Sequence, residues 1–134
     1  MDSVRVADYY YTMVSDKPGE GVRLLRDARV NLLAFSGFPS QRKSQVDFVP
    51  ADSIAFTAAA KAAKVKLKGP KKVFLIEGDD RTGALADTLG KLANAKVNVT
   101  AVDGVCAGMG RYGAILWVKP KDLKKAGAAL GVMM

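Results

Sequence analysis

The sequence predicts an α+β protein made of two copies of one unit, each with the order β-α-β-β-α-β. An apolar stretch followed by an acidic, glycine-containing turn and an amphipathic helix occurs twice, with the turns at residues 16–19 and 80–83. A later helix in each copy is preceded by a Pro-x-Asp motif, at residues 50–52 and 120–122. With 134 residues, of which 49% are hydrophobic, the chain suffices for one ordinary domain or two small ones.

In the first copy, residues 5–14 alternate loosely and carry three tyrosines, as β-strands do. Pro18 suits the first turn of a helix because its missing N–H has no partner there. Asp52 suits the start of an alanine-rich helix because its charge faces the positive helix terminus. The elements expected here are strands at 5–14, 31–35, 45–49 and 65–68, helices at 18–29 and 52–64, and a turn at 36–40.

The second copy repeats this order after a boundary at Gly69-Pro70, so the predicted domains are 1–69 and 70–134. Only residues 131–134 remain for its last strand. Helices would cover one face of each antiparallel sheet, which gives each copy the ferredoxin-like βαββαβ fold. The elements expected in this copy are strands at 72–77, 96–102 and 111–118, and helices at 82–94 and 120–130.

The composition excludes several kinds of chemistry. The sequence has no histidine and a single cysteine, Cys106, so imidazole base catalysis and a thiolate zinc site are both excluded. We therefore expect a protein without catalytic activity, metal or cofactor. The first residues lack the apolar stretch of a signal peptide and no apolar run would span a bilayer, so we expect a cytoplasmic protein that does not bind membranes.

The formal charge of +8 is the one unusual feature of the composition. A basic surface can bind nucleic acid by neutralising phosphates. Spaced lysines without interleaved aromatic residues are more often a solvated face, which we favour. Most of the excess positive charge comes from Lys61, Lys64, Lys66, Lys68, Lys71, Lys72, Lys119, Lys121, Lys124 and Lys125.

Three predicted strands, at residues 32–35, 73–76 and 114–118, are continuously apolar. A sheet with one wet face should alternate instead. Because helices cover only one face, the other face is expected to meet a second sheet, which favours a homo-oligomer such as a dimer. The alternative is that some of these side chains are simply exposed.

The two turns carry a resemblance to a known family. A βαββαβ unit with an Asp-(Lys/Arg)-Pro-Gly turn after its first strand, and an asparagine early in its second, resembles the ACT domain. The second copy departs from the pattern by having Thr82 where the family has proline. The resemblance implies a tandem regulatory protein that binds an amino acid and acts on a partner enzyme. The leading alternative is a nucleic-acid-binding protein of the same fold.

The resemblance also implies a site between the turn of one unit and the second strand of the other. A helix start offers free N–H groups for the ligand carboxylate, and an aspartate offers a countercharge for its ammonium group. Alternatively, each aspartate only caps its helix. The implied ligand-binding residues are Asp16, Lys17, Pro18, Gly19, Asn31, Leu32, Asp80, Arg81, Thr82, Gly83, Asn98 and Val99.

Other ligand motifs are weaker. Residues 108–113 match G-x-G-x-x-G, but a dinucleotide fingerprint must open a helix, whereas here residues 114–118 continue as a strand. We interpret this segment as a hairpin. The RNA-binding module of the same fold needs aromatic residues where this chain has Gly113 and Ile115, so a base-stacking platform is absent.

Overall fold

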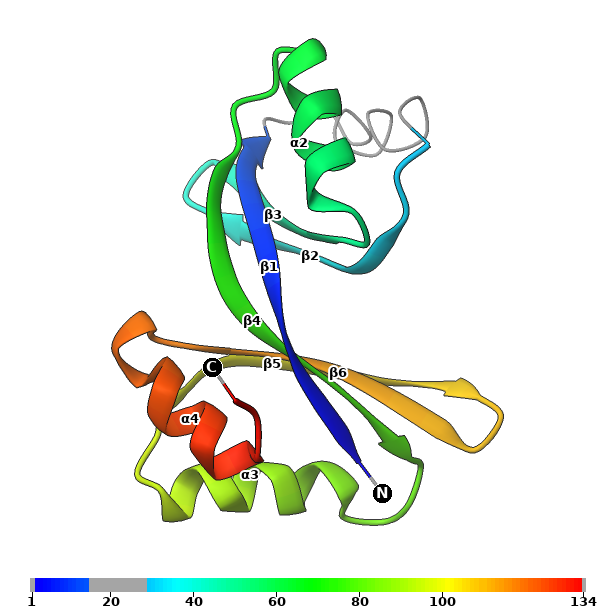
Figure 1. The fold of residues 1–134 in the computed structure, drawn as a ribbon, viewed down its shortest axis with the longest axis vertical. Helices are drawn as coiled ribbons and strands as arrows, with labels where there is room; N and C mark the ends of the chain where they lie inside the picture. The colour runs from blue at the N-terminus through cyan, green and yellow to red at the C-terminus, as the bar shows by residue number, and fades with distance from the viewer. Residues whose placement is uncertain (1, 15–28, 134) are drawn as a thin grey trace. The chain divides into compact units, whose positions relative to one another are not determined.

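A computed structural model describes residues 2–14 and 29–133 of the chain (Figure 1). The paired strands for which a register is given are all antiparallel. The elements are β1 (Ser3–Val14), β2 (Leu32–Ser40), β3 (Lys43–Pro50), α2 (Ser53–Ala62), β4 (Lys68–Asp79), α3 (Ala84–Asn94), β5 (Val99–Gly108), β6 (Arg111–Val118), the 3₁₀ turn η1 (Pro120–Asp122) and α4 (Leu123–Leu130).

The chain forms two compact units. Unit 1 comprises Met1–Ala7 and Lys72–Met134, and unit 2 comprises Asp8–Lys71. The long strands β1 and β4 each pass from one unit to the other, because the limits of the units fall inside both strands. The units are therefore composed differently from the sequence halves 1–69 and 70–134.

Unit 2 has the strand order β2-β3-β1-β4. Tyr10 pairs with Phe48 across β1 and β3, and both rings pack against Phe56 of α2. All three side chains are buried and form the core beneath α2. Asp52 begins α2 as expected, since its Oδ1 accepts a hydrogen bond from the Ala55 amide at 3.1 Å.

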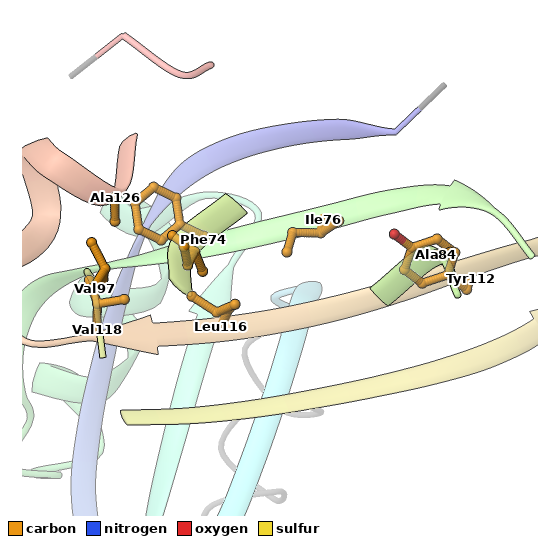
Figure 2. Packing of buried hydrophobic residues seen from close by; sticks show 9 residues of the cluster. Phe74, Ile76, Ala84, Val97, Tyr112, Leu116, Val118 and Ala126 are labelled. Atoms are coloured by element: carbon orange, nitrogen blue, oxygen red, sulfur yellow. The ribbon is translucent and has the colours of Figure 1, made fainter. Parts of the chain in front are cut away.

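Unit 1 has the strand order β1-β4-β6-β5, with α3 and α4 packed on its core. Phe74 of β4 pairs with Leu116 of β6, and both side chains are fully buried. Figure 2 shows them beside Val97 and Ala126, which come from the loop after α3 and from α4. Helices on one face and an antiparallel sheet confirm the predicted α+β, ferredoxin-like fold.

The fourth strand of unit 1 comes from the beginning of the chain. Residues 3–7 of β1 lie beside β4, and Val4 and Val6 pack on the core of unit 1. Residues 131–133, after α4, form no strand. Correspondingly, residues 68–71 of β4 supply the fourth strand of unit 2.

Two local predictions were wrong. Residues 36–40 belong to β2 and not to a turn, which lies at Gln41-Arg42. Because β2 is an edge strand, Pro39 can occupy it without removing a needed hydrogen-bond donor. Residues 65–67 are not in a strand, and Lys68 instead begins the twelve-residue β4, which runs on through Gly69 and Pro70. The predicted helix at 18–29 falls largely outside the described residues.

Two of the three apolar strands, at 73–76 and 114–118, are largely buried within the chain itself. Ile115, Leu116, Trp117 and Val118 of β6 are at most 8% exposed although consecutive residues of a strand face opposite ways. Their continuous apolar character is thus accounted for without a second chain. Large apolar side chains remain exposed on β2, namely Leu33, Phe35 and Phe38, which are 42–45% exposed.

Candidate functional site

The turn between β4 and α3 has an open backbone at the helix start. Gly83 is the N-cap of α3, has φ +80°, and no side chain makes a capping hydrogen bond there. Among the described residues, no atom beyond its chain neighbours lies within 4 Å of where a Cβ on Gly83 would stand. The turn thus presents helix N–H groups and uncrowded backbone, which is the geometry that binds carboxylates and phosphates.

Asp80 is held at this turn by its main chain. Its amide donates to the Gly110 carbonyl oxygen at 2.8 Å, which ties the turn to the β5–β6 hairpin. Its carboxylate lies against the thiol of Cys106 on β5, and this contact raises the pKa of Cys106. Gly83 occupies the cap position of α3, and neither Asp80 nor another side chain makes a capping hydrogen bond there.

Arg81 is engaged within the same unit. Its guanidinium contacts the carboxylate of Asp87 in the first turn of α3 at 2.6 Å, and both side chains are more than half exposed. This ion pair links the turn to the first turn of α3, and the contact with Asp87 raises the pKa of Arg81. Thr82 is exposed, as are Arg81 and Gly83. The described part of the predicted site therefore faces solvent.

Asn98 and Val99 lie at the other end of α3. The helix has eleven residues, so about 16 Å separates its two ends at 1.5 Å per residue. Within unit 1, residues 80–83 and residues 98–99 therefore cannot hold one amino acid together. A site built as the family resemblance implies would need residues from both units.

The candidate residues of the first copy are only partly described. Asp16, Lys17, Pro18 and Gly19 lie outside the described residues. Asn31 is exposed, and its carbonyl oxygen accepts from the Ala51 amide at 2.9 Å. Leu32 begins β2 and packs against the core of unit 2.

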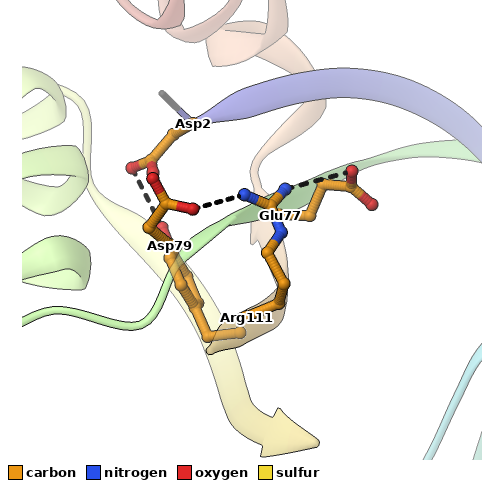
Figure 3. A network of polar contacts seen from close by, with 5 residues as sticks. Asp2, Glu77, Asp79 and Arg111 are labelled. Atoms are coloured by element: carbon orange, nitrogen blue, oxygen red, sulfur yellow. Dashed lines mark hydrogen bonds and ion pairs between the residues drawn. The ribbon is translucent and has the colours of Figure 1, made fainter. Parts of the chain in front are cut away.

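A network of polar side chains surrounds the end of β4 (Figure 3). Arg111, the first residue of β6, donates to Asp79 at 2.9 Å and to Glu77 at 3.4 Å. The Arg111 guanidinium holds the pKa of Asp79 below its usual range. Tyr112 is buried and donates its hydroxyl to Asp2 at 3.0 Å. Burial, followed by the Asp2 contact, raises the pKa of Tyr112.

Unit 2 contains a second polar group that the sequence analysis did not single out. Asp47 of β3 is 3% exposed, and burial raises its pKa even though Gln45 donates to its Oδ1 at 2.9 Å and Lys71 attracts its charge. Burial and the neighbouring Asp47 likewise raise the pKa of Tyr9. The Lys71 ammonium lies 5.1 Å from the ring centroid of Tyr11. An acidic residue flanked by apolar neighbours in a predicted strand was the available signal for this group.

The described residues offer little for catalysis by a metal ion or a thiol. The described residues hold no group of histidine, cysteine or acidic side chains suited to a metal ion. The exposed Cys106 has its pKa raised, and a thiol held protonated is a poor nucleophile. Segment 108–113 is the predicted hairpin and opens no helix, since Gly108 pairs with Arg111 across the turn. None of the helices within the described residues has both the length and the apolar character needed to cross a bilayer.

Comparisons with known proteins identify the fold. No family model matches the chain, and no curated protein sequence matches it. Its structure is similar to that of a protein from Bacteroides thetaiotaomicron, with a TM-score of 0.81 and 20% identity over 96% of this chain and 88% of the other. It is also similar to the regulatory subunits of aspartate kinase from Thermus flavus and Thermus thermophilus. Their TM-scores are 0.57 and 0.59, at 14% and 13% identity, over 97% of this chain and 94% of each subunit.

These similarities cover nearly the whole chain, including both units. At such low identity they show the fold alone. The described residues of each unit have the strand order of a ferredoxin-like unit, with the acidic turn of the resemblance following β4. The structure thus shows two ferredoxin-like units in tandem, which is the fold that the resemblance to the ACT family implies.

Proposed function

We propose that this chain is a non-catalytic regulatory protein that binds a free amino acid at the turn formed by residues 80–83. The observation that carries the proposal is the start of α3. There the helix terminus has no capping side chain and an open Gly83, and Asp80, three residues earlier, contacts Cys106. Helix N–H groups suit the carboxylate of an amino acid, and Asp80 suits its ammonium group.

The structural comparisons support the regulatory part of this proposal. Two of the similar structures are regulatory subunits of aspartate kinase. By analogy, the binding of a ligand would alter the activity of a partner enzyme. On the resemblance alone, we extend the proposed ligand-binding residues to 16–19, Asn31-Leu32 and Asn98-Val99. We place the protein in the cytoplasm, where free amino acids are abundant.

The proposal is tested by thermal denaturation of the full chain with each of the twenty amino acids. A ligand that binds only the folded state stabilises it by about 2.7 kcal/mol at a hundredfold excess over its dissociation constant. We expect one or a few amino acids to raise the melting temperature. The proposal would be contradicted if no amino acid raised the melting temperature at a concentration about a hundredfold above a micromolar dissociation constant.

A matched pair of variants then locates the site. Asp80→Ala should weaken binding about tenfold or more, because a hydrogen bond to a charged group contributes about 1.5 to 3 kcal/mol. Asp103→Ala removes another exposed carboxylate, from β5 of the same unit, and should leave the affinity unchanged. Titration calorimetry measures both. If the two variants bound the ligand with equal affinity, Asp80 would not be part of the site.

We further propose that the chain forms a homodimer through β2. This strand lies at the edge of unit 2 and exposes Leu33, Phe35 and Phe38. Exposed apolar side chains on an edge strand favour pairing with another chain. Sedimentation should show a dimer for the wild type and a monomer for Phe38→Lys. A wild-type monomer would contradict this assignment.

A further inference from the structure

Unit 1 carries a concentrated basic surface at the end of α3 and the beginning of α4. We call it the lysine surface, and its members are all exposed. The two helices meet here, since the Lys125 ammonium donates to the Lys96 carbonyl oxygen at 3.4 Å and both helices share one core. The members are Lys91, Lys96, Lys119, Lys121, Lys124 and Lys125.

The charge of this surface is not neutralised locally. Segments 88–99 and 119–130 contain six lysines and one carboxylate, Asp122. Near the start of α3, by contrast, Arg81 pairs with Asp87, and Arg111 pairs with Asp79 and Glu77. Positive and negative charge are therefore separated along α3, with acidic groups near its start and lysines near its end.

Helix stability explains only part of this arrangement. Lys91 lies in the last turn of α3, where a positive charge complements the negative end of the helix dipole. Lys121, Lys124 and Lys125 lie before and within the first turn of α4, which contains no acidic residue. Positive charges at a helix start are unfavourable, by about 0.3 to 1 kcal/mol each. Groups that oppose local stability in this way are typical of functional sites.

The composition of the surface indicates its ligand. Segments 88–99 and 119–130 contain no arginine and no aromatic residue, so they lack the planar guanidinium and the stacking rings that recognition of bases commonly uses. Neither segment exposes a large apolar side chain of the kind that enters a lipid bilayer. Lysine ammonium groups alone suit phosphates spaced along a duplex. We infer that the lysine surface binds the phosphate backbone of double-stranded nucleic acid without sequence preference.

The test measures binding of the full chain to labelled DNA duplexes of about 20 base pairs, with two unrelated sequences, across salt concentrations from about 50 to 200 mM. We expect equal affinity for both sequences and a steep decrease with salt. The triple variant Lys121→Gln/Lys124→Gln/Lys125→Gln should weaken binding about tenfold or more and reduce the log–log salt slope by about 2 to 3.

The control is Lys61→Gln/Lys64→Gln/Lys66→Gln, which removes the same charge from exposed residues of unit 2. It should leave most of the affinity and slope intact, and melting curves should show that both variants stay folded. Equal loss in the two variants would overturn the inference, because net charge alone would then explain binding. The inference also fails if the wild type binds no duplex at low salt, or binds polyglutamate or phosphatidylglycerol vesicles instead. These outcomes are independent of the amino-acid titrations.

Discussion

The Pro-x-Asp motif has a different backbone conformation in each of the two units. In unit 2, Asp52 is extended, with φ −130° and ψ 101°, and its carboxylate caps α2. In unit 1, Asp122 already has helical angles, with φ −100° and ψ −2°, because Pro120 begins the 3₁₀ turn η1, and Asp122 makes no capping hydrogen bond. The cap therefore depends on where the preceding backbone begins to coil and not on the motif alone.

The units also differ in where their polar groups lie. Unit 2 encloses Asp47 within its sheet, whereas unit 1 leaves Asp79 and Asp80 at an exposed turn. A buried carboxylate must lose its hydration, while an exposed one keeps it until a ligand arrives. Among the described residues, Asp79 and Asp80 of unit 1 therefore stay in contact with water, although Asp79 is paired with Arg111, whereas burial raises the pKa of Asp47 in unit 2.

The largest effect on stability is expected at residues 3–7, which form the fourth strand of unit 1. Val4→Asp/Val6→Asp places two carboxylates against the core of unit 1 and should lower the free energy of unfolding by about 3 kcal/mol or more. Ser3→Asp/Arg5→Asp adds the same groups at exposed positions of the same strand and should have a much smaller effect. Denaturant titration measures both. Equal effects would mean that residues 3–7 are not the fourth strand of unit 1.

A smaller effect should separate the two aspartates of the Pro-x-Asp motifs. Asp52→Ala removes a capping hydrogen bond and should destabilise the protein by about 1 kcal/mol. Asp122→Ala removes no capping hydrogen bond and should cost less, because only the attraction between its charge and the helix terminus is lost. Thermal denaturation of the two variants makes the comparison. A larger loss for Asp122→Ala would reverse the assignment of the caps.

The smallest effect should be pH-dependent. Because burial raises the pKa of Asp47 in the folded state, its protonated form favours folding at low pH, and this contribution is lost as pH rises through the folded pKa. Asp47→Asn keeps an acceptor for Gln45 but never ionises. The variant should melt above the wild type at pH 7, and the difference should shrink as the solution is acidified. A variant less stable than the wild type at pH 7 would show that attraction to Lys71 outweighs the cost of burial.

Local chemistry made much of the fold predictable. The helix starting near Asp52, the hairpin at 108–113 and the strand 111–118 follow from periodicity and turn residues, which act over a few neighbouring positions. The turn at residues 80–83 was recognisable for the same reason. The absence of histidine and the single Cys106 were sufficient to argue against several kinds of catalysis.

Only the tertiary structure decided which strands belong together. Residues 3–7 complete unit 1 and residues 68–71 complete unit 2, although each segment adjoins the other unit in sequence. The alternation of side chains along a strand does not show which other strand it pairs with. Pairing depends on which apolar faces of distant segments are buried together. Strand pairing also puts Pro39 in an edge strand and buries Asp47 between two paired strands, and this burial raises the pKa of Asp47.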